Sequence, residues 1–295
     1  MDTYCEEYKD IKKLAPTSLR RIARNAALTG LSIVDTIAGN FKYLNKPRVQ
    51  FLYIHHAFKD EEEKLDLLLG KLKQNHTFIS YSEAVERVLK SNIDKPYITL
   101  SSDDGFKNNL NILKILNKHG AKACFFINPS IVGESDFEKI KNYCKTRLHF
   151  PPIEFLTWED VEKIQSAGHE IGSHTMSHIN ISAATTEQMT EEISKSYEVI
   201  KNHCGQVSHF AYPYGAFSNF TLSAKKIVFE TGYLSCTSAV RGCHIEQGTT
   251  LENDKLCIRR DHIILDWNIN HIMHFLIHNS RKASVVNNFF PESMR

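Results

Sequence analysis

The sequence lacks the features that mark several common classes of protein. No stretch reaches the roughly 18 consecutive apolar residues of a membrane-spanning helix, so we expect no transmembrane segment. The formal net charge is only +2 and no long basic stripe occurs, so we expect no nucleic-acid partner. The seven cysteines are scattered, odd in number and without a Cys-x-x-Cys pair, which favours a reduced compartment over a disulfide framework.

The first residues also lack an export signal of the usual kind. The segment 1–7 is polar and acidic, and no apolar stretch of signal-peptide type follows it. Together with the cysteines, this predicts a cytoplasmic protein. Hydrophobic residues at 42% and charged residues at 24% are ordinary for a globular enzyme. The length of 295 residues accommodates one α/β barrel, which commonly takes roughly 200–250 residues.

Residues 1–46 differ from the rest of the chain and predict an N-terminal helical extension. Apolar residues recur there at roughly helical spacing, namely Leu19, Ile22, Ala23, Ala26, Ala27, Ile33, Val34, Ile37, Ala38, Phe41 and Leu44. Arg20, Arg21 and Arg24 make the start of this helix basic. We favour a helix packed on the rest of the protein. The alternative is a segment, residues 17–45, that docks on a membrane surface or on a partner.

From residue 47 to residue 295, strand-like and helix-like segments alternate. Strand-like runs occur at 51–55, 97–101, 123–127, up to 172, 233–237 and 256–258. Helix-like segments occur at 61–74, 82–90, 107–119, 157–167 and 185–203. This alternation favours a parallel sheet covered by helices. Residues 129–156 have no clear period and contain Pro151-Pro152, which predicts a loop or a cap near a binding groove.

Two short polar segments follow strand-like runs and carry the chemistry. Asp103 and Asp104 come at the end of the run that starts at Tyr97, and Gly105 relaxes the backbone so that both carboxylates can face one mouth. His174 and His178 lie four residues apart and would be one turn apart on a helix. Two histidines and one carboxylate can hold a metal ion, with the second carboxylate as a general base. This pattern predicts a metal-dependent hydrolase.

A third segment, Phe210-Ala211-Tyr212-Pro213-Tyr214-Gly215, completes a resemblance to a known family. The segments 101–105, 174–178 and 210–215 resemble the motifs of polysaccharide deacetylases of the NodB-homology type, carbohydrate esterase family 4. The stretch 52–56 is similar to the element that opens the barrel in the branch acting on poly-N-acetylglucosamine-like glycans. The likeness runs from about residue 50 to about residue 280. It implies an irregular (β/α) barrel of about seven parallel strands with outer helices.

The resemblance also implies a reaction and a role for each matching residue. Asp104, His174 and His178 would hold the metal, with zinc as the expected ion and cobalt, nickel or manganese as alternatives. Asp103 would be the general base. Tyr212, Pro213 and Tyr214 would line the substrate groove, and the backbone N–H of Tyr214 would help to stabilise the oxyanion. The expected reaction is hydrolysis of the N-acetyl group of an amino sugar in a polysaccharide or saccharide precursor, with release of acetate.

The chain departs from the family pattern at three points. Ser102 replaces the usual phenylalanine before the aspartates, and Ala211 replaces an arginine that orients the catalytic aspartate in many relatives. We expect Arg260, or its neighbour Arg259, to take over that orienting role. The third departure is the general acid, for which the candidates are His55, preferred because it ends the first strand, and His56, His274 and His278. His262 is expected only to form hydrogen bonds at a strand edge.

Two other functions remain open at this point. The first is a catalytically inactive saccharide-binding or scaffold protein on the same fold, which the replacements at Ser102 and Ala211 would permit. The second is a deformylase-type enzyme that releases formate from a sugar amide.

Overall fold

The computed structural model of the chain describes residues 3–14 and 18–291. The strands in this part are β1 (Arg48–Ile54), β2 (Thr77–Phe78), β3 (Pro96–Ser102), β4 (Ala123–Ile127), β5 (Glu170–Ser173), β6 (His209–Ala211), β7 (Ser235–Thr237), β8 (Cys257–Ile258) and β9 (Arg260–His262). The α-helices are α1 (Tyr8–Leu14), α2 (Leu19–Ile37), α3 (Glu62–Leu72), α4 (Tyr81–Leu89), α5 (Leu113–His119), α6 (Phe137–Tyr143), α7 (Trp158–Ser166), α8 (Thr186–Cys204), α9 (Leu222–Thr231) and α10 (Ile269–Arg281).

The strands form one parallel sheet that closes on itself. Their order is β8-β7-β6-β5-β4-β3-β1-β9, and β2 pairs with β3 beside this path. β8 pairs with β7 at one end of the order, and β9 pairs with β1 at the other. Because only Arg259 separates β8 from β9, the single segment 257–262 joins both ends of the sheet. Counting this segment as one strand gives seven strands around the ring, which confirms the predicted irregular (β/α) barrel.

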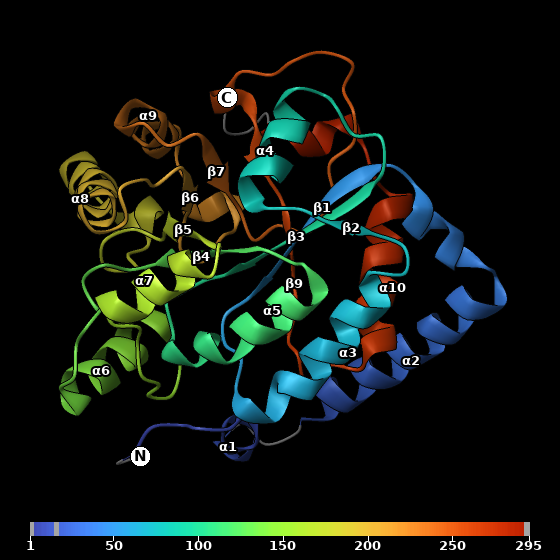
Figure 1. Cartoon of the computed structure of the whole chain (residues 1–295), viewed down its shortest axis with the longest axis horizontal. Coiled ribbons are helices and arrows are strands. Elements are labelled where there is room, and N and C mark those ends of the chain that lie inside the picture. Colours follow the sequence, from blue (N-terminus) through green and yellow to red (C-terminus); the bar gives the residue numbers. More distant parts are fainter. Residues whose placement is uncertain (1–2, 15–17, 292–295) are drawn as a thin grey trace.

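The strands are buried on both faces, as parallel strands covered by helices usually are. Alternate residues divide between two apolar clusters: Leu52 and Phe125 belong to the outer cluster, whereas Phe51 and Phe126 belong to the inner one. Tyr81 of α4 also belongs to the inner cluster. Figure 1 shows the outer helices, among them α3, α5, α7, α8 and α9, arranged around the strands. The carboxyl ends of the strands therefore meet at one mouth of the barrel.

The segment 129–156 contains more regular structure than its sequence predicts. Asp136 caps α6, because its side chain accepts hydrogen bonds from the backbone N–H groups of Glu138 and Lys139. One π-helical turn, Cys144–Leu148, follows α6 directly. A helix of seven residues is too short to show a clear period. Ile140 and Cys144 bury this segment against Phe58 and Phe106, so it is a packed cap rather than a loose loop.

The N-terminal region carries the predicted helix. α2 begins after the capping side chain of Ser18 and lies beside α10 at the outer edge of the molecule (Figure 1). Residue 17, the first of the proposed docking segment, lies outside the described residues. The boundary between residues 46 and 47 stays a prediction. None of the helices in the described ranges is long and apolar enough to cross a bilayer.

Candidate active site

The two aspartates lie where β3 ends at the mouth of the barrel. The backbone N–H of Asp103 donates to the carbonyl oxygen of Ile54 over 3.0 Å, which extends the pairing of β1 with β3. Asp104 and Gly105 then adopt left-handed φ angles of 74° and 73°. A Cβ atom at Gly105 would lie 3.3 Å from the side chain of Ile127, so this close turn favours glycine. The turn lets two neighbouring carboxylates share one mouth, as the sequence predicted.

The two histidines follow β5 on a turn, not on a helix. The N–H of His174 donates to the carbonyl of Ile127 over 2.9 Å, and Thr175 and His178 have left-handed φ angles of 65° and 55°. The side-chain amide of Asn128 donates to the carbonyls of His174 and Thr175. The helical geometry considered for this pair is therefore wrong, but the turn still brings both imidazoles to the same point.

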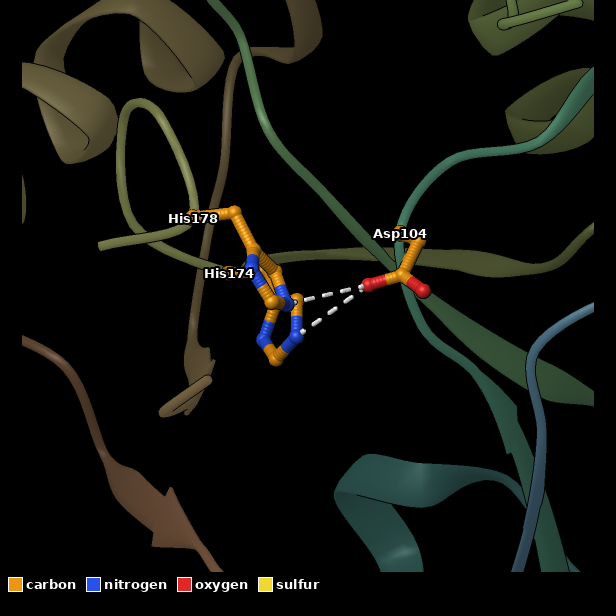
Figure 2. Close-up of side chains that lie close together, drawn as sticks. All are labelled: Asp104, His174 and His178. Atoms are coloured by element: carbon orange, nitrogen blue, oxygen red, sulfur yellow. Dashed lines mark ion pairs between the residues drawn. The ribbon is translucent and has the colours of Figure 1, made fainter. Parts of the chain in front are cut away.

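Asp104, His174 and His178 converge on a small buried volume (Figure 2). Nε2 of His174 lies 3.5 Å from Oδ1 of Asp104, and Nε2 of His178 lies 3.4 Å from the same oxygen. One candidate ligand atom from each residue lies within 4.8 Å of the others. All three side chains are buried. Figure 2 shows the two rings directed at the same carboxylate oxygen.

The chemistry of these three residues fits a divalent cation. Nδ1 of His174 donates to the carbonyl of Ala211 over 2.6 Å, which leaves the lone pair on Nε2 directed at Asp104. Oδ1 of Asp104 is buried and has no hydrogen-bond partner. Burial and the neighbouring Asp103 carboxylate raise the pKa of Asp104 well above its usual range. A cation in contact with that oxygen would offset both the cost of burying the carboxylate charge and its repulsion by Asp103.

Asp103 is held by a buried arginine. Nη1 of Arg260 donates to Oδ1 of Asp103 and Nη2 donates to Oδ2, both over 2.7 Å. Burial alone would raise the pKa of Asp103, but the charge and hydrogen bonds of Arg260 outweigh it, and the pKa lies at about 2. Nε of Arg260 also donates to the carbonyl of Ser238 over 3.1 Å. Both oxygens of the carboxylate are thus fixed, and the group is ionised at neutral pH.

Of the two arginines considered for this role, the structure places Arg260 on Asp103. Arg259 points elsewhere, and its Nε donates to the carbonyl of Asn287 over 3.2 Å. Ala211 is fully buried in β6. Arg260 of β9 thus binds Asp103, a contact that the family pattern assigns to an arginine at the position of Ala211.

The candidate general acids separate clearly in space. His55 follows β1, and its Nδ1 lies 3.2 Å from Nε2 of His262. His56 instead faces the carboxylate of Glu61, with Nδ1 at 3.1 Å from Oε2. His274 lies on α10 and donates to Asp35 of α2 over 2.6 Å, outside the residues that line the cavity beside the aspartates. Burial lowers the pKa of His55 to about 4.

His262 is a site residue that the sequence analysis missed. It lines the cavity together with His55, and burial lowers its pKa well below the usual range. A signal was present, because His262 lies two residues after Arg260 in the same strand. Residues two apart in a strand point to the same face, so His262 had to face the barrel mouth if Arg260 did.

A cavity of about 290 Å³ opens beside these groups. Its lining residues are His55, His56, Asp104, Phe106, Leu148, Phe150, His178, Tyr214 and His262. Tyr214 also borders a second cavity of about 510 Å³, on which Arg147, Ser177 and Glu192 lie. The hydroxyl of Tyr214 donates to the carbonyl of Arg147 over 3.1 Å, and its ring centroid lies 5.2 Å from that of His178. Tyr214 thus stands between the two cavities.

The other residues expected to line the groove behave differently from Tyr214. Tyr214 is 43% exposed, whereas Tyr212 is 1% exposed. The ring of Tyr212 stacks on Phe220 with centroids 4.3 Å apart, so it packs in the core and not toward the cavity. Pro213 is buried as well. Of the three, only the side chain of Tyr214 borders a cavity described here.

Comparisons with known proteins agree with this geometry. Residues 90–233 match a family model described as polysaccharide deacetylase. A chitooligosaccharide deacetylase of Azorhizobium caulinodans is 30% identical over 114 residues, which cover 38% of this chain and 44% of that protein. A peptidoglycan-N-acetylglucosamine deacetylase of Bacillus cereus is 30% identical over 139 residues, which cover 46% of this chain and 42% of that protein. The chain thus spans less than half the length of these relatives.

A solved structure shares the fold over a larger part of the chain. The deacetylase PplD of Streptococcus pyogenes, solved in complex with acetate, superimposes with a TM-score of 0.60 at 18% identity. The match covers 78% of this chain and 99% of that structure. The barrel and its outer helices are therefore shared with a solved deacetylase.

Proposed function

Residues 90–233 belong to the polysaccharide deacetylase family, and on this premise we propose that the protein is a metal-dependent deacetylase of an N-acetylated amino sugar. One observation carries the proposal: Asp104, His174 and His178 converge beside the fixed Asp103–Arg260 pair, and Asp104 and His178 line one cavity. A set of metal ligands next to an ionised carboxylate is an arrangement that supports amide hydrolysis by water.

The metal site would be formed by Asp104, His174 and His178, with zinc as the proposed ion. When bound, such an ion polarises a carbonyl group and lowers the pKa of water toward about 7. Asp103 is the proposed base that accepts the proton of the attacking water. Arg260 holds both oxygens of Asp103, so it keeps the base ionised and oriented. Arg260 is therefore a positioning residue.

Cleavage of the amide bond also needs a proton donor for the leaving amine. We assign this step to the pair formed by His55 and His262, which shares the cavity with Asp104. Because burial lowers the pKa of both imidazoles, the pair would receive its proton from Asp103, which takes it from the attacking water, and would pass it to the leaving amine. The backbone N–H of Tyr214 is the proposed donor to the oxyanion, and its exposed ring is the proposed contact for a sugar.

The cavity supports a small acyl group as the part of the substrate that enters. Phe106, Leu148 and Phe150 give it apolar walls beside the polar groups, and such walls suit a methyl group. The named activities of the two curated relatives concern chitooligosaccharides and peptidoglycan N-acetylglucosamine. We therefore propose an oligosaccharide that contains N-acetylglucosamine as the substrate class. The location of the protein in the cell stays a prediction.

The test is acetate release from chitooligosaccharides by the zinc-reconstituted protein, with free amines measured in parallel. We expect one acetate per amine formed. Asp103→Asn should lower kcat by about 10²–10⁴-fold, the usual contribution of a general base, and keep the metal. Asp254→Asn changes a partly exposed aspartate outside the cavity in the same way and is the matched control. Thermal unfolding of each variant shows that both are folded.

The outcomes separate the proposed functions. Full activity of Asp103→Asn would show that the base is another residue. Formate release from an N-formylated sugar, without acetate release from the acetylated one, would favour the deformylase. A folded wild-type protein that binds the oligosaccharide and releases neither acid would favour the inactive binding protein.

A further inference from the structure

Helix α2 (Leu19–Ile37) packs on the rest of the protein with its more polar side, and its more apolar side faces outward. A helix at the surface of a globular protein normally turns its apolar face inward and its polar face to water. In α2, the residues buried against the protein are Leu28, Ser32 and Asp35. Two of these three are polar. The apolar residues whose spacing predicted the helix are largely on the outside.

The inner face of α2 is attached to α10 by polar contacts. The hydroxyl of Ser32 donates to the carbonyl of Asn270 over 3.1 Å. Oγ1 of Thr29 lies 3.0 Å from Nε2 of His271. The carboxylate of Asp35 accepts from Nδ1 of His274 over 2.6 Å. These contacts fix the rotation of α2, because turning the apolar face inward would break all of them.

The outer face of α2 carries an apolar strip, with large side chains at its two ends and the exposed Ala23, Ala26 and Gly30 between them. Leu19 and Ile22 are three residues apart, Ile22 and Ile33 are eleven apart and Ile33 and Ile37 are four apart, so all four lie on one side of the helix. Their exposed fractions are 85%, 54%, 54% and 82%, and Val34 at its margin is 56% exposed. Large apolar side chains that are exposed elsewhere in the described residues, such as Leu67, Leu222 and Val286, lie on separate elements. A contiguous apolar strip marks a surface that something covers.

The segment that contains the strip carries charges that are almost all positive. Between residues 18 and 46 the chain has five cationic side chains, Arg20, Arg21, Arg24, Lys42 and Lys46, and a single acidic one, Asp35. Asp35 is buried and already bonded to His274 and Asn40. The cations therefore have no acidic neighbour within this segment. Arg24 already stacks on Trp267, with its guanidinium 5.4 Å from the ring centroid, so Arg20, Arg21, Lys42 and Lys46 are the cations proposed to face an anionic partner.

Aromatic rings lie among these cations just after α2. The ammonium groups of Lys42 and Lys46 lie 5.6 and 4.8 Å from the ring centroid of Tyr43, and the guanidinium of Arg281 lies 5.3 Å from it. Lys71 stands 6.0 Å from the ring of Phe41. Basic side chains mixed with aromatic rings beside an apolar strip are typical of a helix that lies in the headgroup layer of a membrane.

We propose that α2 and residues 38–46 form a peripheral binding surface for an anionic lipid bilayer, with the apolar strip inserted among the acyl chains. A second copy of the chain fits less well. Parallel pairing of two α2 helices would bring Arg20 and Arg24 against the same arginines. Antiparallel pairing would bring them toward Lys42 and Lys46. Both arrangements place like charges together, whereas an anionic surface neutralises them.

The experiment is co-sedimentation of the full chain with two kinds of vesicle, one of phosphatidylcholine alone and one of phosphatidylcholine and phosphatidylglycerol in equal parts. We expect binding to the anionic vesicles that weakens as salt is raised, and little binding to the neutral ones. Ile33→Glu/Ile37→Glu should reduce the partition coefficient at least about 10-fold, because two buried side chains are lost from the lipid. Arg20→Gln should reduce it about 5-fold, since one basic residue near the surface contributes about 1 kcal/mol.

A matched control keeps the test specific. Leu222→Glu/Val286→Glu changes two exposed apolar residues on other elements (48% and 70% exposed) by the same substitution, and it should bind vesicles as the wild type does. Circular dichroism and sedimentation velocity accompany each variant. Equal binding by the Ile33/Ile37 variant would overturn the proposal. So would a dimer in solution that this variant dissociates, with no vesicle binding by the wild type, which would assign the strip to a second copy.

Discussion

The barrel mouth and helix α2 both bury polar side chains, but α2 also exposes large apolar side chains to water. At the mouth, Arg260 meets both oxygens of Asp103, and His174 and His178 converge on Asp104, whose Oδ1 has no hydrogen-bond partner. On α2, polar side chains are buried as well, but the apolar side chains face water. At the mouth, the chain itself supplies the partners of the charged side chains, except for a cation beside Asp104. Helix α2 leaves an apolar surface that the chain itself does not cover.

The comparison shows what hydrophobic periodicity can and cannot establish. The spacing of apolar residues in α2 correctly predicts a helix with two faces. It does not tell which face points inward, because that depends on the partner. The partner surface, α10, offers the carbonyl of Asn270 and the side chains of His271 and His274, so the polar face of α2 binds there. The favoured interpretation, a helix packed on the barrel, describes the position of α2 but not its orientation.

Removing His174 and His178 should have the largest effect, because these are two of the three candidate metal ligands. We expect His174→Ala/His178→Ala to lose the bound ion and to lower acetate release by roughly 10³-fold or more, since a metal supplies several kcal/mol of transition-state stabilisation. Metal content after zinc loading and desalting is the direct measurement. The wild type should retain about one ion per chain.

The control for this variant is His203→Ala/His278→Ala, which removes two exposed histidines and should leave the metal content unchanged. An equal loss in both variants would mean that zinc binds at the surface. A wild type that is folded but retains no ion would contradict the assignment of Asp104, His174 and His178 as metal ligands. The barrel mouth would then lack the cation that completes its polar groups.

Arg260→Gln should come next, because it leaves a buried carboxylate without its charge partner. Breaking a buried ion pair from one side usually costs about 3–5 kcal/mol, so we expect a large loss in the free energy of unfolding and in kcat, with a smaller change in KM. Arg260→Lys should recover part of kcat. The double variant Arg260→Gln/Asp103→Asn should be more stable than Arg260→Gln alone, because neither charge remains buried.

Chemical denaturation of these variants measures the coupling between the two positions as a double-mutant cycle. If the double variant were as unstable as the sum of both single variants, Arg260 would stabilise the barrel through Ser238 and Tyr53 and not through Asp103.

The candidate site could be predicted from the sequence to the extent that topology determines it. In a closed parallel barrel, every strand delivers its last residues to the same mouth, so Asp103, Asp104 and His174 had to meet once their strands were recognised. Arg260 instead begins β9 and pairs with Phe51 in the middle of β1, and its long side chain reaches Asp103. The local shape of the turns could not be predicted. Thr175 and His178 adopt left-handed φ angles, which residues other than glycine rarely adopt, and nothing in the sequence marks them.

The fold was predictable in outline for a similar reason. Alternating strands and helices favour a parallel sheet, but closure depends on one short segment, residues 257–262, that pairs with two different strands. Its two parts have only two and three residues, which is too short for a sequence pattern. Tyr212 shows the same limit for side chains, because its packing on Phe220 depends on tertiary contacts that the motif does not contain.

Acid should lower the free energy of unfolding through buried histidines. This extends the comparison of buried polar groups with the water-exposed face of α2. Burial lowers the pKa of His76 and of His244 to about 4. In the unfolded chain these histidines bind protons near pH 6.5, so their neutral, hydrogen-bonded forms stabilise the fold fully above that pH. The stabilisation is lost as pH falls from about 6.5 to 4, by roughly 3 kcal/mol for each residue.

Equilibrium unfolding at several pH values between 7 and 4 measures this loss. His244 is the clearer test, because its two ring nitrogens bond to Asn288 and to the backbone N–H of Arg259. His244→Gln should unfold more easily at pH 7 but show a shallower pH dependence. An unchanged slope would mean that His244 is not the group that titrates.

The smallest effects should come from α2, where a buried polar residue should contribute more to stability than an exposed apolar residue. Asp35→Ala removes hydrogen bonds to His274 and Asn40, so we expect a loss of about 1.5–3 kcal/mol in the free energy of unfolding and faster hydrogen exchange along α2. Ile33→Glu places a charge on a side chain that is 54% exposed and should change stability by no more than about 0.5 kcal/mol. In an ordinary amphipathic helix the isoleucine would matter more than the aspartate. If Ile33→Glu is the more destabilising of the two in the isolated protein, the apolar face of α2 is already covered, and the contrast between the two regions disappears.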